Sequence, residues 1–172
     1  MSESNYVRKR ESRAEHGQTR DLSYPPLPEA LVVGTYDNHA HLEIADGDNP
    51  MDYREHLDRA SAVGVLGVVQ VGGDLETSRW SAEVAAREPR LLAAVAIHPN
   101  EAPNYEAAGT LDDALAEIDE LASRPRVRAI GETGLDYHYD HSPRDVQAAA
   151  FRAQVAIAKE LGKPIVIHTR SA

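Results

Sequence analysis

Two histidines, His39 and His41, stand two residues apart in the run Asp37-Asn38-His39-Ala40-His41-Leu42, at the carboxyl end of the first predicted strand. Side chains alternate along a strand with a period of two, so both imidazoles project from one face if this segment is a strand end. Two imidazoles on one face can reach a single divalent metal ion, and packing does not require such a pair. The alternative is a pair of surface histidines at the start of a loop.

Two more residues of the metal-binding type follow later in the chain. Glu132 lies in Gly131-Glu132-Thr133-Gly134-Leu135-Asp136-Tyr137, and His168 ends the apolar run Pro164-Ile165-Val166-Ile167. A carboxylate has two oxygens and can bridge two cations, which an imidazole cannot do. Glu132 could instead be a capping or solvated residue, and His168 could be a hydrogen-bonded core histidine. Together with the histidine pair, these residues predict a metallohydrolase.

Three further residues are assigned to contacts with the substrate or with the metal ligands. His98 precedes Pro99, which restricts the backbone of His98 to an extended conformation, so we expect His98 to bind a substrate phosphate or to position water. Asp37 either hydrogen-bonds a ligand histidine and fixes its tautomer, or caps the loop. Asp136 is placed with these two residues in the same role.

The elements that must position these residues follow a regular alternation. Short runs rich in Val and Ile alternate with amphipathic segments, which indicates repeated βα units around a parallel sheet. One predicted helix covers 111–122 with Thr110 as its N-cap, and another follows Ser142 as a cap, begins at Pro143 and ends at Gly162. Four helices in all separate five predicted strands, which cover roughly 31–37, 65–71, 91–97, 127–131 and 164–168.

Every candidate residue falls at or just after the carboxyl end of a predicted strand. In a TIM-type (β/α)₈ barrel, this rim is where active sites are built. We therefore expect an α/β fold of the barrel kind found in metal-dependent hydrolases. A complete barrel takes about 250 residues, whereas this chain has 172 and stops after the fifth strand, so we expect only the first five strands. Residues 31–172 are predicted to form this partial barrel, preceded over 1–30 by a flexible charged tail with a proline-rich linker.

Composition narrows the kind of site and of partner. The chain has no Cys, so a metal would be held by His and carboxylate, which suits hard or borderline divalent cations. A net charge of −10 argues against non-specific coating of nucleic acid, but two bound cations would reverse the local field, so a nuclease stays open. No apolar run is long enough to span a bilayer, and we expect a cytoplasmic protein without a membrane partner or a stable protein partner.

These motifs resemble those of the TatD-type metal-dependent hydrolases, a branch of the amidohydrolase-like barrels that includes magnesium-dependent deoxyribonucleases. The resemblance runs from about residue 35 to 172. It implies that His39 and His41 bind one metal, that Glu132 is shared between two and that His168 binds the second, with Mg²⁺ or Mn²⁺ as the ions and Zn²⁺ as an alternative. It also implies a nuclease that hydrolyses phosphodiester bonds of DNA by metal-activated water, trimming single strands from the 3′ end.

The sequence also departs from the family pattern. Glu43 stands where an Asp usually follows the histidine pair, a mild change on the loop. The family also has a metal-binding His on a later strand and an Asp on the last strand, for which the sequence contains no positions. Two alternatives to the nuclease stay open: an amidohydrolase-like enzyme acting on a small ester, amide or lactone, and an inactive fragment. Glu132 stands where many amidohydrolases carry a bridging carboxylated Lys, which favours the nuclease.

Overall fold

The computed structural model describes residues 7–10, 19, 21–47, 49–138 and 142–172. Its contacts divide the chain into two compact units, the N-terminal unit Met1–Val68 and the C-terminal unit Val69–Ala172. Half of the predicted tail lies outside the described residues, and the division into a tail and a partial barrel stays a prediction. None of the helices formed by the described residues has the length and hydropathy needed to cross a lipid bilayer.

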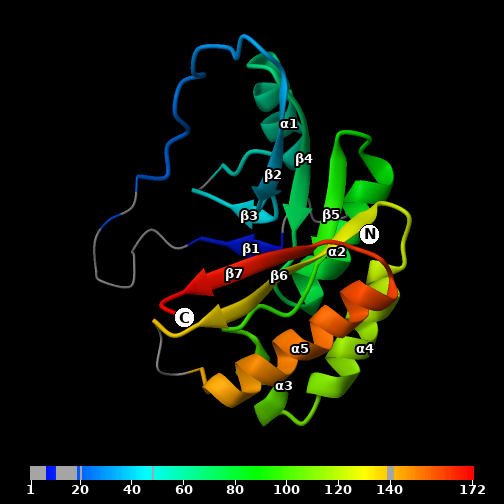
Figure 1. Ribbon diagram of the computed structural model, residues 1–172. Coiled ribbons are helices and arrows are strands. Elements are labelled where there is room, and N and C mark those ends of the chain that lie inside the picture. The colour runs from blue at the N-terminus through cyan, green and yellow to red at the C-terminus, as the bar shows by residue number, and fades with distance from the viewer. Residues whose placement is uncertain (1–6, 11–18, 20, 48, 139–141) are drawn as a thin grey trace, which may run out of the picture. The chain divides into compact units, whose positions relative to one another are not determined.

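In the N-terminal unit, helix α1 (Tyr53–Ala62) lies beside the beginning of strand β4 (Val65–Val71) (Figure 1). Arg8–Lys9 (β1) pairs in parallel with Ile44–Ala45 (β3), and β2 neighbours β4 in the sheet order. Asp52 caps α1 by accepting a hydrogen bond from the Arg54 N–H, while the Glu55 side chain accepts one from the Asp52 N–H, which forms a capping box. Strand β2 covers Thr35–Ala40.

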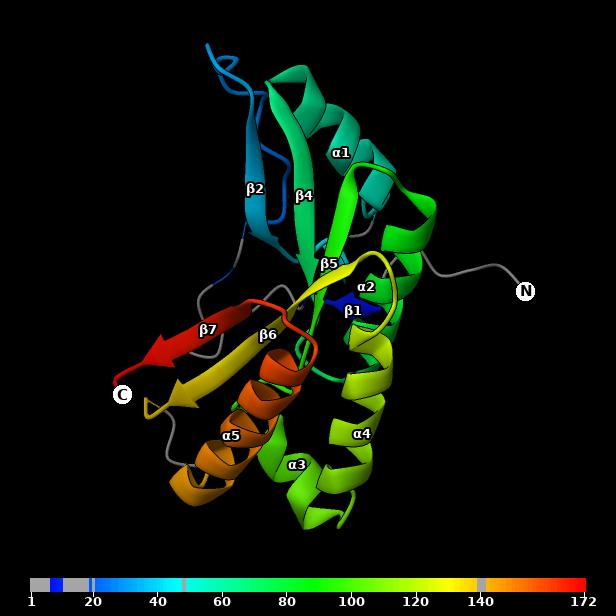
Figure 2. The same cartoon turned by 45° about the vertical axis from the view of Figure 1, so that its right-hand side comes forward.

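The C-terminal unit is an alternation of helices and parallel strands. The end of β4 is followed in the sheet order by β5, β6 and β7, and both the β5–β6 and β6–β7 pairs are parallel. Helix α5 runs along β6 (Figure 2). The elements are α2 (Leu75–Arg87), β5 (Leu91–Val95), α3 (Ala102–Ala107), α4 (Leu111–Ala122), β6 (Val127–Asp136), α5 (Arg144–Glu160) and β7 (Ile165–Arg170).

All five predicted strands are present, and the short elements β1, β3 and α3 add to them. The core of the C-terminal unit is formed where buried side chains of three neighbouring strands meet. Burial of these side chains removes apolar surface from water. The central cluster consists of Val71, Ala94 and Ala129, with Val69 and Val166 packed against it.

Strand β6 carries an irregularity at its centre. Ile130 pairs with Ile165, but the next pair joins Thr133 to Ile167, so β6 uses one more residue than β7 over this stretch. An extra residue of this kind is a β-bulge, which re-aims side chains and is common next to active sites. The sequence predicted that this strand ends at residue 131, which is wrong, because β6 resumes its pairing after the bulge and continues to Asp136.

The N-terminal unit contains a histidine whose titration should affect stability. The pKa of His56 on α1 is lowered because burial penalises the charged ring, and Arg59 lowers it further, while Asp46, Glu55 and Asp52 oppose the shift. A lowered pKa in the folded state means that the unfolded chain binds the proton first. Stability should therefore fall as pH drops below the ordinary histidine value of about 6.5, by at most about 1.4 kcal/mol per pH unit.

Urea unfolding at pH 7.5 and 5.5 measures this effect. We expect His56→Gln to lose less stability than the unmodified protein between the two pH values, because it removes this one titration. The control is His138→Gln, since His138 is exposed. Equal losses in His56→Gln and in the unmodified protein would contradict the prediction.

Candidate metal centre

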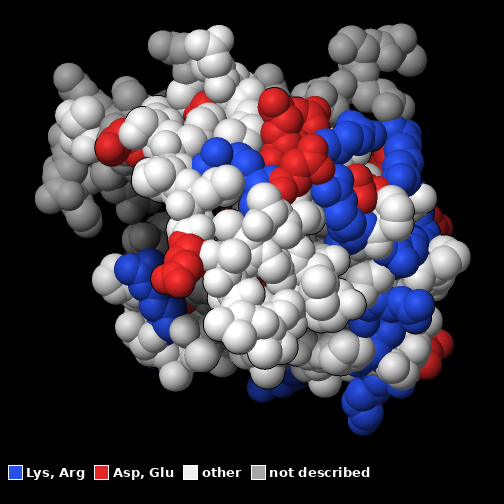
Figure 3. Space-filling model, turned by 90° about the horizontal axis from the view of Figure 1, so that it is seen from above, with Lys and Arg blue, Asp and Glu red and all other residues white. Residues whose placement is uncertain are grey.

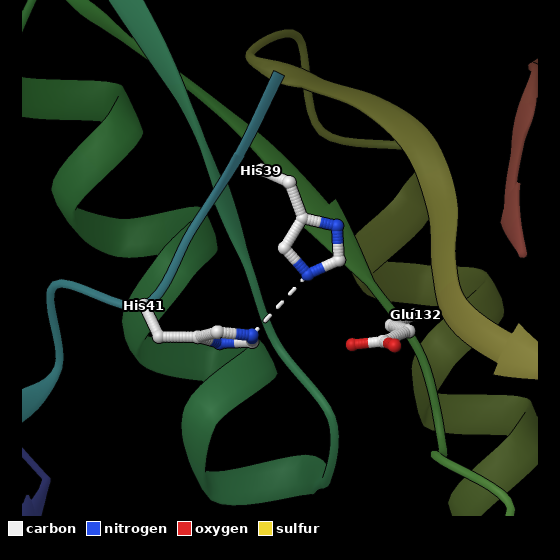
Figure 4. A group of neighbouring side chains, drawn as sticks. All are labelled: His39, His41 and Glu132. Carbon is white, nitrogen blue, oxygen red and sulfur yellow. Dashed lines mark hydrogen bonds between the residues drawn. The ribbon is translucent and has the colours of Figure 1, made fainter. Parts of the chain in front are cut away.

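The histidine pair lies on β2 and directly after it. The Nε2 atoms of His39 and His41 are 3.3 Å apart, and the ring planes are inclined at 70°. Figure 4, which also draws Glu132 of β6, shows the two rings directed toward each other. The alternation of strand residues thus brings two imidazole nitrogens to one point, as the spacing of two residues predicts.

Two carboxylates act on this pair in different ways. Asp37 Oδ1 accepts the backbone N–H of His39 at 2.9 Å, which is the loop-capping role among the two considered. Glu43 is buried, and its Oε1 lies 3.4 Å from Nδ1 of His41. A carboxylate at one ring nitrogen orients an imidazole and raises its basicity at the other nitrogen. Sequence reasoning missed this role of Glu43, whose only signal is its position two residues after His41.

A second group of titratable side chains lies wholly within the C-terminal unit. Each of His98, Glu132 and His168 offers one ligand atom, and these atoms lie within 4.8 Å of one another. Glu132 Oε1 is 2.6 Å from Nδ1 of His168 and 3.9 Å from Nε2 of His98. All three residues are half-buried, so the group is partly shielded and still reachable from solvent.

His168 is held between two carboxylates. Its Nε2 lies 3.0 Å from Oδ2 of Asp136, a buried residue that also accepts hydrogen bonds from the Asn100 amide at 3.1 Å and from the His138 backbone N–H at 3.0 Å. Burial by itself raises the pKa of Asp136, but the hydrogen bonds from these three residues hold the pKa below its ordinary value. Asp136 is therefore ionised at neutral pH. No pattern in the sequence indicates Asn100 as its partner.

His98 makes a different pattern of contacts. Its Nδ1 accepts the backbone N–H of Asn100 at 3.1 Å. A neutral ring with an acceptor at Nδ1 carries its proton on Nε2, and Nε2 is the atom on the side of Glu132. His98 is therefore set up to donate a hydrogen bond from Nε2, and its assignment to substrate or water stays a prediction.

The backbone of the group is held by the glycine pair that follows β4. The Gly73 carbonyl accepts the N–H of His98 at 2.7 Å, and the Gly72 carbonyl accepts the N–H of Glu132 at 3.3 Å. A Cβ at Gly72 would lie 2.6 Å from the Cα of Ser78, so only glycine fits against α2 there. These two carbonyls fix the chain at two of the three members of the group.

The donor sets fit divalent metal ions. A metal-binding histidine typically presents one ring nitrogen to the ion and the other to a carboxylate. His41 has Glu43 at Nδ1, and His168 has Asp136 at Nε2. Imidazole nitrogens and carboxylate oxygens without thiolates suit Mg²⁺, Mn²⁺ or Zn²⁺.

Comparison with known sequences agrees with these motifs. The model of the family described as TatD related DNase matches residues 36–172. The "uncharacterized metal-dependent hydrolase YabD" of Bacillus subtilis is 41% identical over 137 residues, which cover 80% of this chain and 51% of that protein. The "3'-5' ssDNA/RNA exonuclease TatD" of a Rahnella species is 38% identical over 132 residues, covering 76% of this chain and 48% of the relative. The chain thus spans about half the length of these relatives.

Solved structures agree on the fold. YJJV, a TatD homologue from Escherichia coli, superposes with a TM-score of 0.66 at 24% identity, covering 80% of this chain and 51% of that one. An uncharacterized amidohydrolase from Saccharomyces cerevisiae gives 0.69 at 24% identity, covering 81% and 49%. These likenesses confirm the α/β fold of the TIM-barrel kind that the sequence predicts. With the family model matched from Tyr36 to the last residue, the chain belongs to the TatD related DNase family.

Proposed function

We propose that this chain carries the metal site of a hydrolase that cleaves phosphodiester bonds of single-stranded DNA, removing nucleotides from the 3′ end. The observation that carries the proposal is the group His98, Glu132 and His168, with Asp136 at the second nitrogen of His168. This arrangement combines a metal-binding histidine, a carboxylate able to bridge ions and a hydrogen-bond donor for a phosphate. Two divalent ions, Mg²⁺ or Mn²⁺ with Zn²⁺ as the alternative, complete the proposal.

Each side chain has a distinct role in this proposal. From the family resemblance we assign His39 and His41 to one ion and His168 to a second, with Glu132 able to bind both. Bound divalent ions lower the pKa of coordinated water and stabilise negative charge on phosphate oxygens.

The hydrogen-bonding residues complete the assignment. Asp136 fixes the tautomer and orientation of His168, and Glu43 does the same for His41. The Nε2–H of His98 donates a hydrogen bond to a phosphate oxygen of the substrate. Asp37 shapes the turn that carries the histidine pair.

The charge distribution favours a substrate recognised at the site and not by a basic surface. The chain has a net charge of −10. On the face drawn in Figure 3, Asp and Glu side chains lie beside Lys and Arg side chains. In this proposal, bound cations and His98 would attract the phosphate. One relative is named an ssDNA/RNA exonuclease, which supports a nucleic acid as the substrate. A cytoplasmic location stays a prediction.

The test is degradation of single-stranded DNA labelled at its 5′ end. We expect a ladder of shortened labelled products with Mg²⁺ or Mn²⁺ and none with EDTA, because removal of the ions leaves no means to activate water. DNA blocked by phosphorothioate linkages at its 3′ end is the control and should stay intact. A panel of small esters, amides and lactones is tested alongside. If members of that panel are hydrolysed while the DNA stays intact, the enzyme is an amidohydrolase and not a nuclease. If neither the DNA nor the panel is hydrolysed, the proposal is overturned.

A further inference from the structure

Helix α5 carries two fully buried glutamines, Gln147 and Gln154. They are seven residues apart, close to two helical turns, so both lie on the same face of the helix. A buried amide that lacks partners is costly, because its lost hydrogen bonds to water are not replaced. The partners of these two side chains therefore indicate why they are buried.

The Gln154 side chain binds the chain next to two members of the metal-type group. Its Oε1 accepts the Ile97 N–H at 2.8 Å, and its Nε2 donates to the Ile97 carbonyl at 3.0 Å and to Thr133 Oγ1 at 2.8 Å. Ile97 directly precedes His98, and Thr133 directly follows Glu132. One carboxamide thus links the two segments that carry the phosphate donor and the bridging carboxylate.

Gln147 does the same for the third segment. Its Oε1 accepts the Asp136 N–H at 2.8 Å, and its Nε2 donates to the Asp136 carbonyl at 2.9 Å and to the Ser142 carbonyl at 2.9 Å. The backbone of Asp136 is therefore fixed on both sides of its Cα. Its carboxylate in turn contacts His168 at 3.0 Å.

These bonds replace strand pairing where the strand ends. Strand β5 ends at Val95, so the N–H and carbonyl groups of the next residues need other partners. The Ser78 hydroxyl of α2 accepts a hydrogen bond from the Ala96 N–H at 3.2 Å and donates one to the Ala96 carbonyl at 3.2 Å. Gln154 serves Ile97 from α5. A carboxamide both accepts and donates, so it can satisfy one N–H and one carbonyl together, which neither Glu nor Met can do.

We propose that Gln154 and Gln147 are positioning residues of the metal centre. Gln154 fixes His98 and Glu132, and Gln147 fixes Asp136 and through it His168. The inference rests on the proposed function, since it assigns these residues to the same site. It predicts that substituting a residue of α5 that does not itself contact metal or substrate lowers metal affinity and changes the environment of the His98 ring.

The first variant is Gln154→Met, which keeps the length of the side chain and removes both hydrogen-bonding atoms. We expect the Kd for Mn²⁺, measured by calorimetric titration, to rise about 10- to 100-fold, the range for groups that orient metal ligands. In metal-free protein, the ¹⁵N and ¹H signals of the His98 imidazole should shift, while those of His56 stay in place.

The matched control is Ile118→Ala in α4. Ile118 is fully buried, so this change also lowers stability. It should leave Mn²⁺ affinity within about twofold and the His98 signals unmoved, which separates positioning from general destabilisation. Gln147→Met should weaken Mn²⁺ binding like Gln154→Met and shift the His168 ring signals.

The outcomes distinguish the inference from the function on which it rests. Wild-type affinity and unmoved His98 signals in Gln154→Met would overturn the inference while the proposed function stands. If the unmodified protein binds no Mn²⁺, the proposed function fails, and the His98 signals of the metal-free variant then decide the inference alone. If Gln154→Met does not fold, Thr133→Val removes one partner of Gln154 with little change of shape. Unchanged Mn²⁺ affinity in that variant would likewise count against the inference.

Discussion

Replacing Glu132 by Gln is expected to reduce both Mn²⁺ affinity and DNA hydrolysis by more than about 100-fold, since even groups that only orient ligands are worth 10- to 100-fold. The amide keeps the shape of the carboxylate but loses its charge and one acceptor oxygen. In the structure, Oε1 of Glu132 lies 2.6 Å from Nδ1 of His168, so the lost charge is the one at the centre of the group. Calorimetric titration with Mn²⁺ and the rate of DNA degradation at saturating ion measure the two effects.

The control for this change is Glu120→Gln, which makes the same chemical substitution at an exposed position of α4. That variant should keep the affinity and the rate within about twofold, because exposed charges away from a site interact weakly through water. Activity of Glu132→Gln within threefold of the unmodified protein would show that hydrolysis does not use this carboxylate. Loss of activity with unchanged Mn²⁺ affinity would move Glu132 from metal binding to another step.

The sequence predicts elements well where the signal is local. Strand β4 and helix α4 have the predicted bounds, because an apolar run or a helical stripe determines each of them. Strand β2 was predicted over 31–37 and is found at Thr35–Ala40. Val32 and Val33 are β-branched residues typical of strands, yet they are 102% and 77% exposed. The start of β2 depends on its hydrogen-bond partners and not on strand propensity. Thr35, its first residue, donates its N–H to the carbonyl of Gly64, directly before β4.

The start of α5 shows a similar limit. The sequence predicted that Ser142 caps this helix and that Pro143 is its first residue. The structure shows that this is wrong, because Pro143 is the N-cap and makes no capping side-chain bond. The Ser142 hydroxyl instead donates to the Pro99 carbonyl at 2.7 Å. A partner 43 residues away in the sequence leaves no local pattern that could have revealed this bond.

The same limit holds for the candidate site: local signals predict some of its residues, and long-range contacts supply the rest. Alternation along a strand and the ends of apolar runs point to His39, His41, Glu132 and His168, because those signals lie within a few residues. The supporting contacts are long-range: Asn100 reaches Asp136 over 36 positions, and Gln154 reaches Ile97 over 57. A local hint for Gln154 is that it is a polar residue on the apolar face of an amphipathic helix, a feature that also occurs without function.

In the sequence, the glycines on either side of Glu132 are typical of a turn. In the structure, both Gly131 and Gly134 lie inside strand β6. Gly134 lies within β6, pairs with His168 of β7 and has a φ of +152°. This backbone conformation is one that side-chain-bearing residues rarely adopt. A Cβ at Gly134 would overlap the His168 carbonyl oxygen, which belongs to the backbone and cannot rotate away. Glycine is thus required there for the two strands to pair.

Gly134→Ala is therefore expected to lower the free energy of unfolding by more than about 4 kcal/mol, a size that single substitutions reach only through a few severe mechanisms. Gly109→Ala is the matched control, because Gly109 has a φ of +68° but a Cβ added there would meet no described atom within 4 Å. Its expected cost is about 1 kcal/mol, that of a left-handed backbone alone. Urea denaturation of both variants measures the difference. Equal losses would mean that β7 can shift away from β6 at little cost, and the short distance from His168 to Glu132 would then not depend on this glycine.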